Sequence, residues 1–458
     1  MMGEAGTKNE QLNEEGFRVH HLSEHEFNLD SISPNAIKVV HQLKSQGYEA
    51  YLVGGCVRDL LLDREPKDFD VATSALPEEV RQVFRNSRLI GRRFRLAHVR
   101  FGREIIEVAT FRGSGNSIDG SGDGINNGQD TSQEIHEDGR ILRDNVYGSM
   151  DEDAIRRDFT INALYLDPED ETVLDRVNGM VDHQNRLIRL IGDPEERYRE
   201  DPVRLLRAIR FAAKLDFEIA VETLQPISTL GSLLSGVPQA RLYEEILKLF
   251  LSGHALQTFE DLCRHDLLKQ LFPQTDQMLN QAGNESLRQL IKLALRSTDS
   301  RLAENKPVTP YFLFAALLWG GVEKAVHNRL DSENEYMVMQ HAMGEILREQ
   351  AQTVALPKRS SIPMREVWTL QPRFRQRRGS RPHRLLEHPR FRAAYDFLLL
   401  RAETGSENSE LAEWWTKFQA VGSAQRKKMT QPKQQRRSHR SKTTPKKSAP
   451  VTSKPGDA

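Results

Sequence analysis

The chain has 458 residues, 38% of them hydrophobic and 28% charged, which is enough for two to four domains of a soluble globular protein. No run of 18 or more apolar residues is present, and this excludes a membrane-spanning helix. The acidic, polar start lacks the basic region and apolar run of a secretory signal, which favours a cytoplasmic protein. Two cysteines, Cys56 and Cys263, are too few for a disulfide framework or a zinc site.

The formal net charge of zero conceals a strong asymmetry. Residues 424–458 hold eleven Lys or Arg residues against one acid, Asp457. Residues 358–384 hold nine against one acid, Glu366. Two cationic segments on an acidic body indicate a polyanionic partner, with nucleic acid favoured over a membrane surface.

The first ordered element follows a leader, residues 1–30, that we expect to be disordered. "SPNAIKVVHQLKSQG" predicts a helix that begins after Ser33, has Pro34 in its first turn and stops at Gly47. A strand, "YEAYLVGG", a helix, "CVRDLLLD", and a strand containing "DFDVATS" follow. The helix "PEEVRQVF" and two strands, "RFRLAHVRF" and "EIIEVATF", complete a compact sheet covered by helices.

Residues 113–139 are rich in Gly, Ser, Asn and Asp without periodicity, so we expect a flexible loop, for which a lid over a site is one interpretation. Strand signals return in "RRDFTINALYLD" and "TVLDRV" and stop after about residue 183, where helical patterns take over. The expected fold is α+β: a head with a mixed sheet and helices, an all-α neck and body, and a disordered basic tail. The expected bounds are 31–183 for the head, 184–252 for the neck, 253–410 for the body and 411–458 for the tail.

Asp68 and Asp70 stand two residues apart in a strand-like run, so both carboxylates point to the same face. Adjacent carboxylates repel each other and resist burial, and a divalent metal ion would offset that cost. Most Asp-x-Asp triplets are turn or surface residues, so the pair alone is a weak signal. Phe69 between them is expected to face the core and anchor the strand.

Gly54 and Gly55 lie at a strand-to-helix junction, where the backbone can approach a bulky anion. Arg58, in the next helical turn, could contact a phosphate, although a tight structural turn with a surface arginine is the simpler interpretation. A phosphate cradle beside paired carboxylates is what a Mg²⁺–nucleoside triphosphate requires.

Glu107 is an acid inside an otherwise apolar strand that we expect beside the Asp70 strand. One interpretation makes it a metal ligand or a residue near the site. The other makes it an edge residue paired with an arginine such as Arg112.

Two further motifs carry nucleotide-binding side chains. In "RRDFTINAL", Arg157 suits phosphate, and Asp158 and Asn162 suit ribose hydroxyls. In "YREDPVRLLRAIRF", Asp201 and Arg204 are neighbours at i, i+3 and could read a base edge, with Arg207 and Arg210 further along the helix. The plainer interpretation is a capping aspartate with a solvated basic stripe.

The late cluster "WTLQPRFRQRRGSRPHR" mixes arginines with Trp368 and Phe374, and the aromatic rings are candidates for stacking on unpaired bases. The tail should bind polyanions by charge alone, unless it merely aids solubility. The expected RNA-binding residues are Arg373, Arg375, Arg377, Arg378, Arg381, Arg436 and Arg437.

Together, "LVGGCVRDLL", "DFDVAT", "EVATFR", "RRDFTINAL", "RLIGDPEERYREDPVRLLRAIRFAAKL" and "LLEHPRFRAAYDFLLLRAE" resemble the bacterial poly(A) polymerases, over residues 50–402. With the tRNA CCA-adding enzymes these form one class of nucleotidyltransferases. The resemblance implies a head with metal-binding aspartates, a neck that reads the incoming base and helical segments that hold RNA.

Carried over to this sequence, the resemblance makes Asp68 and Asp70 the metal-binding carboxylates. It assigns nucleotide binding to a set of motif residues and base selection to Asp201 and Arg204 within that set. Asp158 is also expected among the active-site acids, with Glu107 as a rival third carboxylate that would bind metal. The nucleotide-binding set is Gly54, Gly55, Arg58, Arg157, Asn162, Asp201, Arg204 and Arg207.

The resemblance implies transfer of AMP from ATP to RNA 3′ ends with two Mg²⁺ ions. One ion would activate the 3′-hydroxyl and the other would neutralise the triphosphate. CCA addition to tRNA is the alternative, and "LIGRRFRLAHV", the long basic tail and the late "LLEHPRF" segment favour poly(A) synthesis. A catalytically inactive RNA-binding protein is a third possibility. We expect a monomer that works with RNA-decay proteins.

Overall fold

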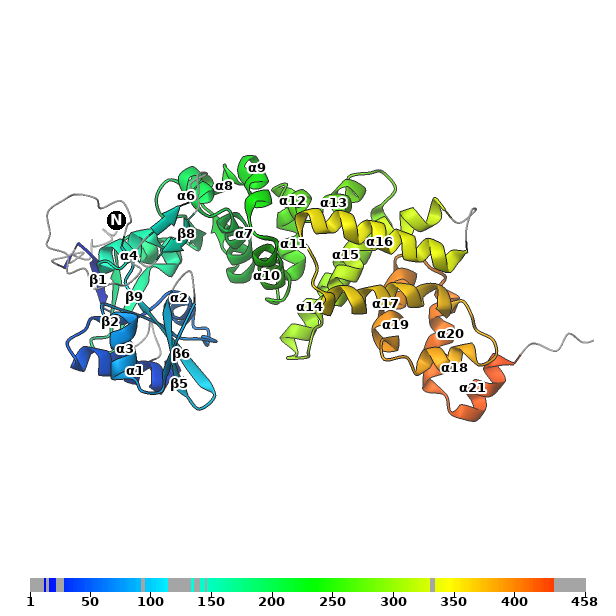
Figure 1. Cartoon of the computed structure of the whole chain (residues 1–458), viewed down its shortest axis with the longest axis horizontal. Coiled ribbons are helices and arrows are strands. Elements are labelled where there is room, and N and C mark those ends of the chain that lie inside the picture. Colours follow the sequence, from blue (N-terminus) through cyan, green and yellow to red (C-terminus); the bar gives the residue numbers. More distant parts are fainter. Residues whose placement is uncertain are drawn as a thin grey trace, which may run out of the picture.

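The computed structural model describes residues 12–13, 16–21, 29–91, 95–113, 133–135, 141–144, 146–329 and 334–431. The molecule is elongated, with the sheet-containing head at one end and the C-terminal helices at the other (Figure 1). Within the described ranges, no helix is both long enough and apolar enough to cross a membrane.

The head contains an eight-stranded mixed sheet in the order β1-β10-β9-β2-β3-β6-β5-β4. Neighbouring strands are antiparallel except β3 and β6, which are parallel. The strands are β1 (Arg18–His21), β2 (Ala50–Val53), β3 (Asp70–Thr73), β4 (Ser87–Ile90), β5 (Leu96–Phe101), β6 (Glu104–Thr110), β9 (Leu164–Asp167) and β10 (Thr172–Asp175). The helices of the head are α1 (Pro34–Ser45), α2 (Gly55–Leu61), α3 (Pro77–Val83), α4 (Met150–Arg156) and α5 (Gly179–Gln184), with the 3₁₀ turns η1 (Leu29–Ser31) and η2 (Thr160–Asn162).

The first helix of the head and the inward-facing Phe69 are found as the sequence predicts. Ser33 caps α1 by accepting a hydrogen bond from the Asn35 amide at 3.2 Å, and Gly47 follows the helix with φ of +87°. Phe69 is 8% exposed and packs in the head core, which confirms that it faces inward. Strand β3 begins only at Asp70, so Asp68 belongs to the segment that leads into the strand.

The glycine-rich segment is only partly described. Strand β7 (Gln133–Ile135) pairs antiparallel with β8 (Ile141–Asp144), apart from the main sheet. Residues 114–132 and 136–140 lie outside the described residues, so the flexible-loop and lid predictions stay predictions.

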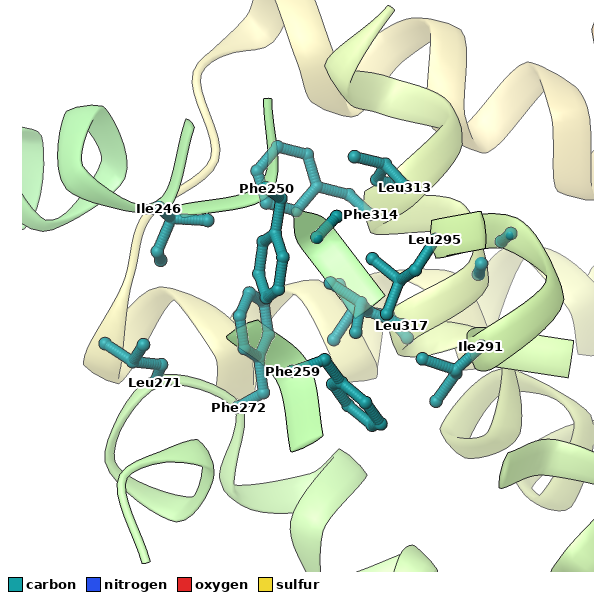
Figure 2. Packing of buried hydrophobic residues seen from close by; sticks show 14 of the residues in the cluster. Ile246, Phe250, Phe259, Leu271, Phe272, Ile291, Leu295, Leu313, Phe314 and Leu317 are labelled. Carbon is teal, nitrogen blue, oxygen red and sulfur yellow. The ribbon is translucent and has the colours of Figure 1, made fainter. Parts of the chain in front are cut away.

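Neck and body share one continuous hydrophobic core that runs from Phe159 to Phe418. Figure 2 shows part of it, where Phe250, Phe259 and Phe314 from three helices meet Phe272 from the junction between two further helices. The neck comprises β11 (Leu187–Ile188), α6 (Pro194–Glu200), α7 (Val203–Leu215), β12 (Glu218–Ile219), α8 (Val221–Leu224), α9 (Ile227–Leu230), η3 (Gly231–Gly236) and α10 (Gln239–Phe250). The body comprises α11 (Ala255–Arg264), α12 (Leu268–Leu271), α13 (Pro273–Leu279), α14 (Glu285–Ala303), α15 (Pro310–His327), α16 (Glu335–Thr353), α17 (Lys358–Phe374), α18 (Arg381–Leu386), α19 (Phe391–Glu403), α20 (Ser409–Ala420) and α21 (Ser423–Thr430).

The expected leader, residues 1–30, is not disordered throughout, because β1 (Arg18–His21) pairs with β10 in the main sheet and Phe17 is fully buried. The structure corrects three further expectations. Strands do not end at residue 183, because β11 and β12 form a short parallel pair in the neck. Helices α20 and α21 extend the ordered body beyond residue 410 to Thr430, since Trp415 and Phe418 are fully buried there.

The third correction concerns the proposed base-stacking rings. Trp368 and Phe374 are both fully buried in helix α17, and the Trp368 indole Nε1 donates a hydrogen bond to the Ala315 carbonyl at 3.1 Å. Neither ring can stack on a base without unfolding this part of the core. The stacking assignment is therefore wrong.

We predict that Trp368→Ala lowers the free energy of unfolding by about 3–5 kcal/mol, because it opens a cavity in the shared core. The measurement is denaturant unfolding followed by far-ultraviolet circular dichroism. Trp368→Phe, which keeps most of the volume, serves as the control and should lose much less stability. A Trp368→Ala protein as stable as the parent would contradict the packing role.

Candidate active site between head and neck

A cleft lies where the head meets the neck, between β3, β6, α4 and the start of α7. It brings together five of the predicted site residues: Asp70, Glu107, Arg157, Asp201 and Arg204. Its other lining residues are Val53, Val71, Leu96, Ala109, Arg112, Asp153, Arg156 and Glu200. Carboxylates from the sheet thus face a wall rich in arginine, which is the arrangement needed to hold a phosphate ester beside a cation.

The acidic side of this head–neck cleft is set by strand register. Asp70 stands directly opposite Glu107 across the parallel pair β3–β6, which confirms that the two strands are neighbours. Burial raises the pKa of Asp70 to about 6, and the charges of Glu107 and Asp68 add to this increase while Arg157 opposes it. The three acids therefore act on one another electrostatically.

Asp68 is more accessible than Asp70. It is exposed and lines a second hollow on the head together with Glu65, Lys67 and Glu104. The two predicted ligands thus flank the buried Phe69, and only Asp70 lines the head–neck cleft.

Glu107 has a partner that the sequence did not identify. The His98 Nε2 lies 3.1 Å from a Glu107 carboxylate oxygen, from the adjacent position on β5. This contact orients the Glu107 side chain, and the cross-strand pairing of β5 with β6 is the signal that would have predicted it.

The glycine turn adopts the conformation that the cradle requires. Gly54 has φ of +80°, which favours glycine, and a Cβ there would stand 3.7 Å from the Arg157 guanidinium. Arg58 is buried rather than exposed. Its guanidinium donates to the Asn162 side-chain oxygen at 2.7 Å and to Asp59, so it ties the turn to the η2 segment.

Arg157 is held by two residues that the sequence analysis missed. Its guanidinium pairs with Asp153 at 2.8 Å and donates to the Tyr165 hydroxyl at 3.1 Å, while that hydroxyl donates to Asp153 at 2.7 Å. Burial raises the pKa of Asp153, but the Arg157 charge and the hydrogen bonds outweigh burial and hold it below its usual value. This buried triad fixes Arg157 at the cleft wall.

Asp158 lies apart from the acidic pair. Its carboxylate forms an ion pair with Arg207 at 2.5 Å and accepts hydrogen bonds from the Phe159 amide and the Asn162 side chain. Burial opposes its ionisation, yet Arg207 and these hydrogen bonds bring its pKa down to about 2. Asp158 thus joins the head to helix α7 of the neck as a permanently charged anchor.

The two residues predicted to read the base have separate partners. Asp201, which precedes α7, pairs with Arg241 of α10 at 2.6 Å. Arg204 is 9% exposed and bonds to Glu200 at 2.7 Å and to the Arg197 carbonyl at 2.8 Å. Arg241 and Glu200 were not predicted, because only the folded neck brings them to this place.

The predicted RNA-binding arginines lie at the other end of the molecule. Arg373, Arg375, Arg377, Arg378 and Arg381 are exposed near the end of α17 and the start of α18. Arg436 and Arg437 lie outside the described residues.

Three family models match the chain in the order of its segments. "Poly A polymerase head domain" matches residues 50–189, "Probable RNA and SrmB- binding site of polymerase A" matches residues 216–279, and "Polymerase A arginine-rich C-terminus" matches residues 331–449. The poly(A) polymerase I of Salmonella typhi is 48% identical over 89% of this chain and 86% of its own length. The chain belongs to the poly(A) polymerase family.

Sequence similarity to the CCA-adding enzyme of Lactobacillus helveticus covers a smaller share of the chain. The CCA-adding enzyme of Lactobacillus helveticus is 38% identical over 51% of this chain and 53% of its own length. The crystal structure of the Bacillus stearothermophilus CCA-adding enzyme in complex with CTP has the same fold, with a TM-score of 0.53 and 26% identity over 84% of this chain and 82% of that one. The sequence similarity to the poly(A) polymerase I of Salmonella typhi thus extends through much more of the chain than the sequence similarity to this CCA-adding enzyme.

We predict that Asp70→Asn stabilises the metal-free protein at neutral pH. The pKa of Asp70 is raised in the folded state from 3.8 to about 6, so the folded protein is destabilised as the carboxyl ionises with rising pH. The variant cannot ionise, so its gain of about 1–3 kcal/mol should be full above pH 6 and should vanish as pH falls below the unfolded value near 4. Thermal unfolding in a chelating buffer across this pH range measures the difference. A gain that is the same at all pH values would contradict the electrostatic origin.

Proposed function

We propose that the protein adds AMP units from ATP to the 3′ end of RNA and releases pyrophosphate. In this reaction the 3′-oxygen forms a bond to the α-phosphorus, the α–β anhydride bond breaks, and pyrophosphate leaves with the bonding electrons while the hydroxyl proton is released. The observation that carries the proposal is the single cleft in which Asp70 and Glu107 face Arg157 and Arg204, in a chain of the poly(A) polymerase family.

The donor set of the cleft fits a divalent metal ion. Among the described residues, no group of three or more His, Cys, Asp or Glu side chains forms a ready-made metal cage. Mg²⁺ in nucleotide sites is held by one or two carboxylates together with substrate phosphates, so a complete protein cage is not required. Burial, together with the charges of Glu107 and Asp68, raises the pKa of Asp70, and a cation bound beside this carboxyl would favour its ionised form.

We assign Asp68 and Asp70 as the metal-binding carboxylates and Glu107 as the third acid. Glu107 lies directly opposite Asp70, whereas Asp158 is neutralised by Arg207. Bound Mg²⁺ would supply charge neutralisation on the triphosphate and raise the acidity of the 3′-hydroxyl. Two such ions are the number implied by the resemblance.

The remaining residues hold and select the nucleotide. Arg157, fixed by Asp153 and Tyr165, presents its charge to the phosphates, and the Gly54 turn leaves room for them. Asp201 and Arg204 provide one acceptor and several donors for the base edge from the neck side of the cleft. Arg58 joins the glycine turn to the η2 segment, and Asp158 joins the head to the neck. A direct phosphate contact of Arg58 needs its bond to Asn162 to be given up.

CCA addition remains the competing activity because the two enzyme classes share the head and neck motifs. The predictions of a cytoplasmic monomer that works with RNA-decay proteins stay predictions.

The decisive assay offers a short RNA primer with Mg²⁺ and each nucleoside triphosphate separately. We expect long tails with ATP alone and no product with Asp70→Asn, which should still bind RNA. A short addition that depends on CTP would contradict polyadenylation. Lack of incorporation with every triphosphate would instead indicate an inactive RNA-binding protein.

A further inference from the structure

Tyr336 stands apart from the other aromatic residues. Of the aromatic side chains in the part of the chain that the structure describes, Tyr336 alone is exposed, at 58%. The rings once considered for base stacking, Trp368 and Phe374, are fully buried. An aromatic ring left in solvent is a candidate contact for a partner with flat, unpaired surfaces.

The backbone that carries the ring is anchored. Tyr336 is the second residue of α16, and its amide donates to the capping Asn334 side chain at 2.9 Å. The preceding residue, Glu335, forms an ion pair with Arg375 at 3.5 Å, and Arg375 also pairs with Glu407 at 3.0 Å. Arg375 therefore fastens the start of α16 to the end of α17.

The most arginine-rich stretch of the chain begins at this junction. Beyond it, the Gly379 amide donates to the Thr430 carbonyl at 2.9 Å, which brings the end of α21 against the segment that leads into α18. In Figure 1, α18, α20 and α21 cluster at the end of the molecule far from the head. We call the exposed cations of this region the C-terminal basic surface: Arg373, Arg377, Arg378, Arg381, Lys427 and Lys428.

These charges are available to a ligand. Among the described residues, the structure gives the side chain of none of these six cations an ion-pair partner, in contrast to Arg375, Arg390 and Arg392 nearby. The chain leaves this surface at Gln431 and continues with eight more Lys or Arg residues. An exposed ring that is joined through Glu335 and Arg375 to a segment rich in unpaired cations matches the chemistry of single-stranded nucleic acid, in which phosphates alternate with stackable bases.

We propose that Tyr336 is a stacking platform for an unpaired base of single-stranded RNA whose phosphates lie on the C-terminal basic surface. The proposal rests on RNA being the substrate. It replaces Trp368 and Phe374 by a residue that solvent can reach, and it assigns Arg375 the role of positioning Tyr336. Because this surface lies far from the head–neck cleft, it holds RNA upstream of the reacting 3′ end and sets affinity, not the rate of the chemical step.

Met337, 48% exposed beside Tyr336, makes a protein-docking patch the alternative. The six unpaired cations of the C-terminal basic surface favour a polyanion over an apolar protein surface.

The test measures binding of a fluorescent oligoadenylate of about 15 nucleotides to the full chain over a range of salt concentrations. Tyr336→Ala should weaken binding roughly 5- to 150-fold at every salt concentration and leave the salt slope unchanged, because stacking releases no counterions. Tyr336→Phe should bind as the parent does. Arg377→Ala with Arg378→Ala should instead flatten the salt slope.

Ile362→Ala provides the matched control, since Ile362 is an exposed apolar residue, 54% accessible, in the first half of α17. It should bind RNA as the parent does. AMP incorporation by Tyr336→Ala at saturating primer should also match the parent, which separates this proposal from the proposed function. Unchanged affinity in Tyr336→Ala would overturn the proposal and leave the ring to a protein partner. Equal losses in Tyr336→Phe and Tyr336→Ala would show that the hydroxyl, not the ring, makes the contact.

Discussion

Asp70 and Glu107 face each other across the only parallel strand pair in the main sheet described here, and the burial of Asp70 beside a second acid is the constraint on which the site depends. Antiparallel neighbours could have been joined by a tight turn, whereas the parallel pair β3–β6 requires the crossover through α3, β4 and β5. His98, on strand β5 of that crossover, lies beside Glu107. The resulting acidic pair is unfavourable in isolation, since burial and neighbouring charges raise the pKa of Asp70 to about 6. A cation brought by the nucleotide turns this unfavourable pair into a binding site.

The arginines around the cleft have two different roles, and their bonding partners and positions distinguish these roles. Arg58 and Arg207 are tied by carboxylate or amide partners and join the glycine turn, the η2 segment and helix α7. Arg157 is fixed by Asp153 and Tyr165 yet still lines the cleft. Each of these ion pairs has one side chain largely buried, where removing a single partner leaves an uncompensated charge and is strongly destabilising. The head and neck are thus held together by the same motifs that surround the nucleotide, and the catalytic geometry depends on that junction.

Much of the head could be predicted, because its helices and strands follow from residues close together in the sequence. The Ser33 cap, the inward Phe69 and the neighbouring strands of Asp70 and Glu107 follow from side-chain periodicity and helix-end chemistry. The partners of the cleft residues could not be predicted, since Tyr165, Glu200 and Arg241 arrive through packing between distant segments. The buried Trp368 was missed for a related reason. Pro363 and Pro372 interrupt the helical pattern of α17, and the basic residues around them conceal its apolar face.

The central proposal is a metal site formed by Asp68, Asp70 and Glu107 together with the bound nucleotide, with Asp158 serving as a structural anchor. The most direct measurement is the thermal midpoint of unfolding with Mg²⁺, with an ATP analogue that cannot be incorporated, and with both together. In the parent, the two together should raise the midpoint by more than the sum of the separate shifts. Glu107→Gln should abolish this excess shift. Asp158→Asn should lower the midpoint under every condition but leave the excess shift unchanged. An excess that survives in Glu107→Gln and disappears in Asp158→Asn would contradict the account.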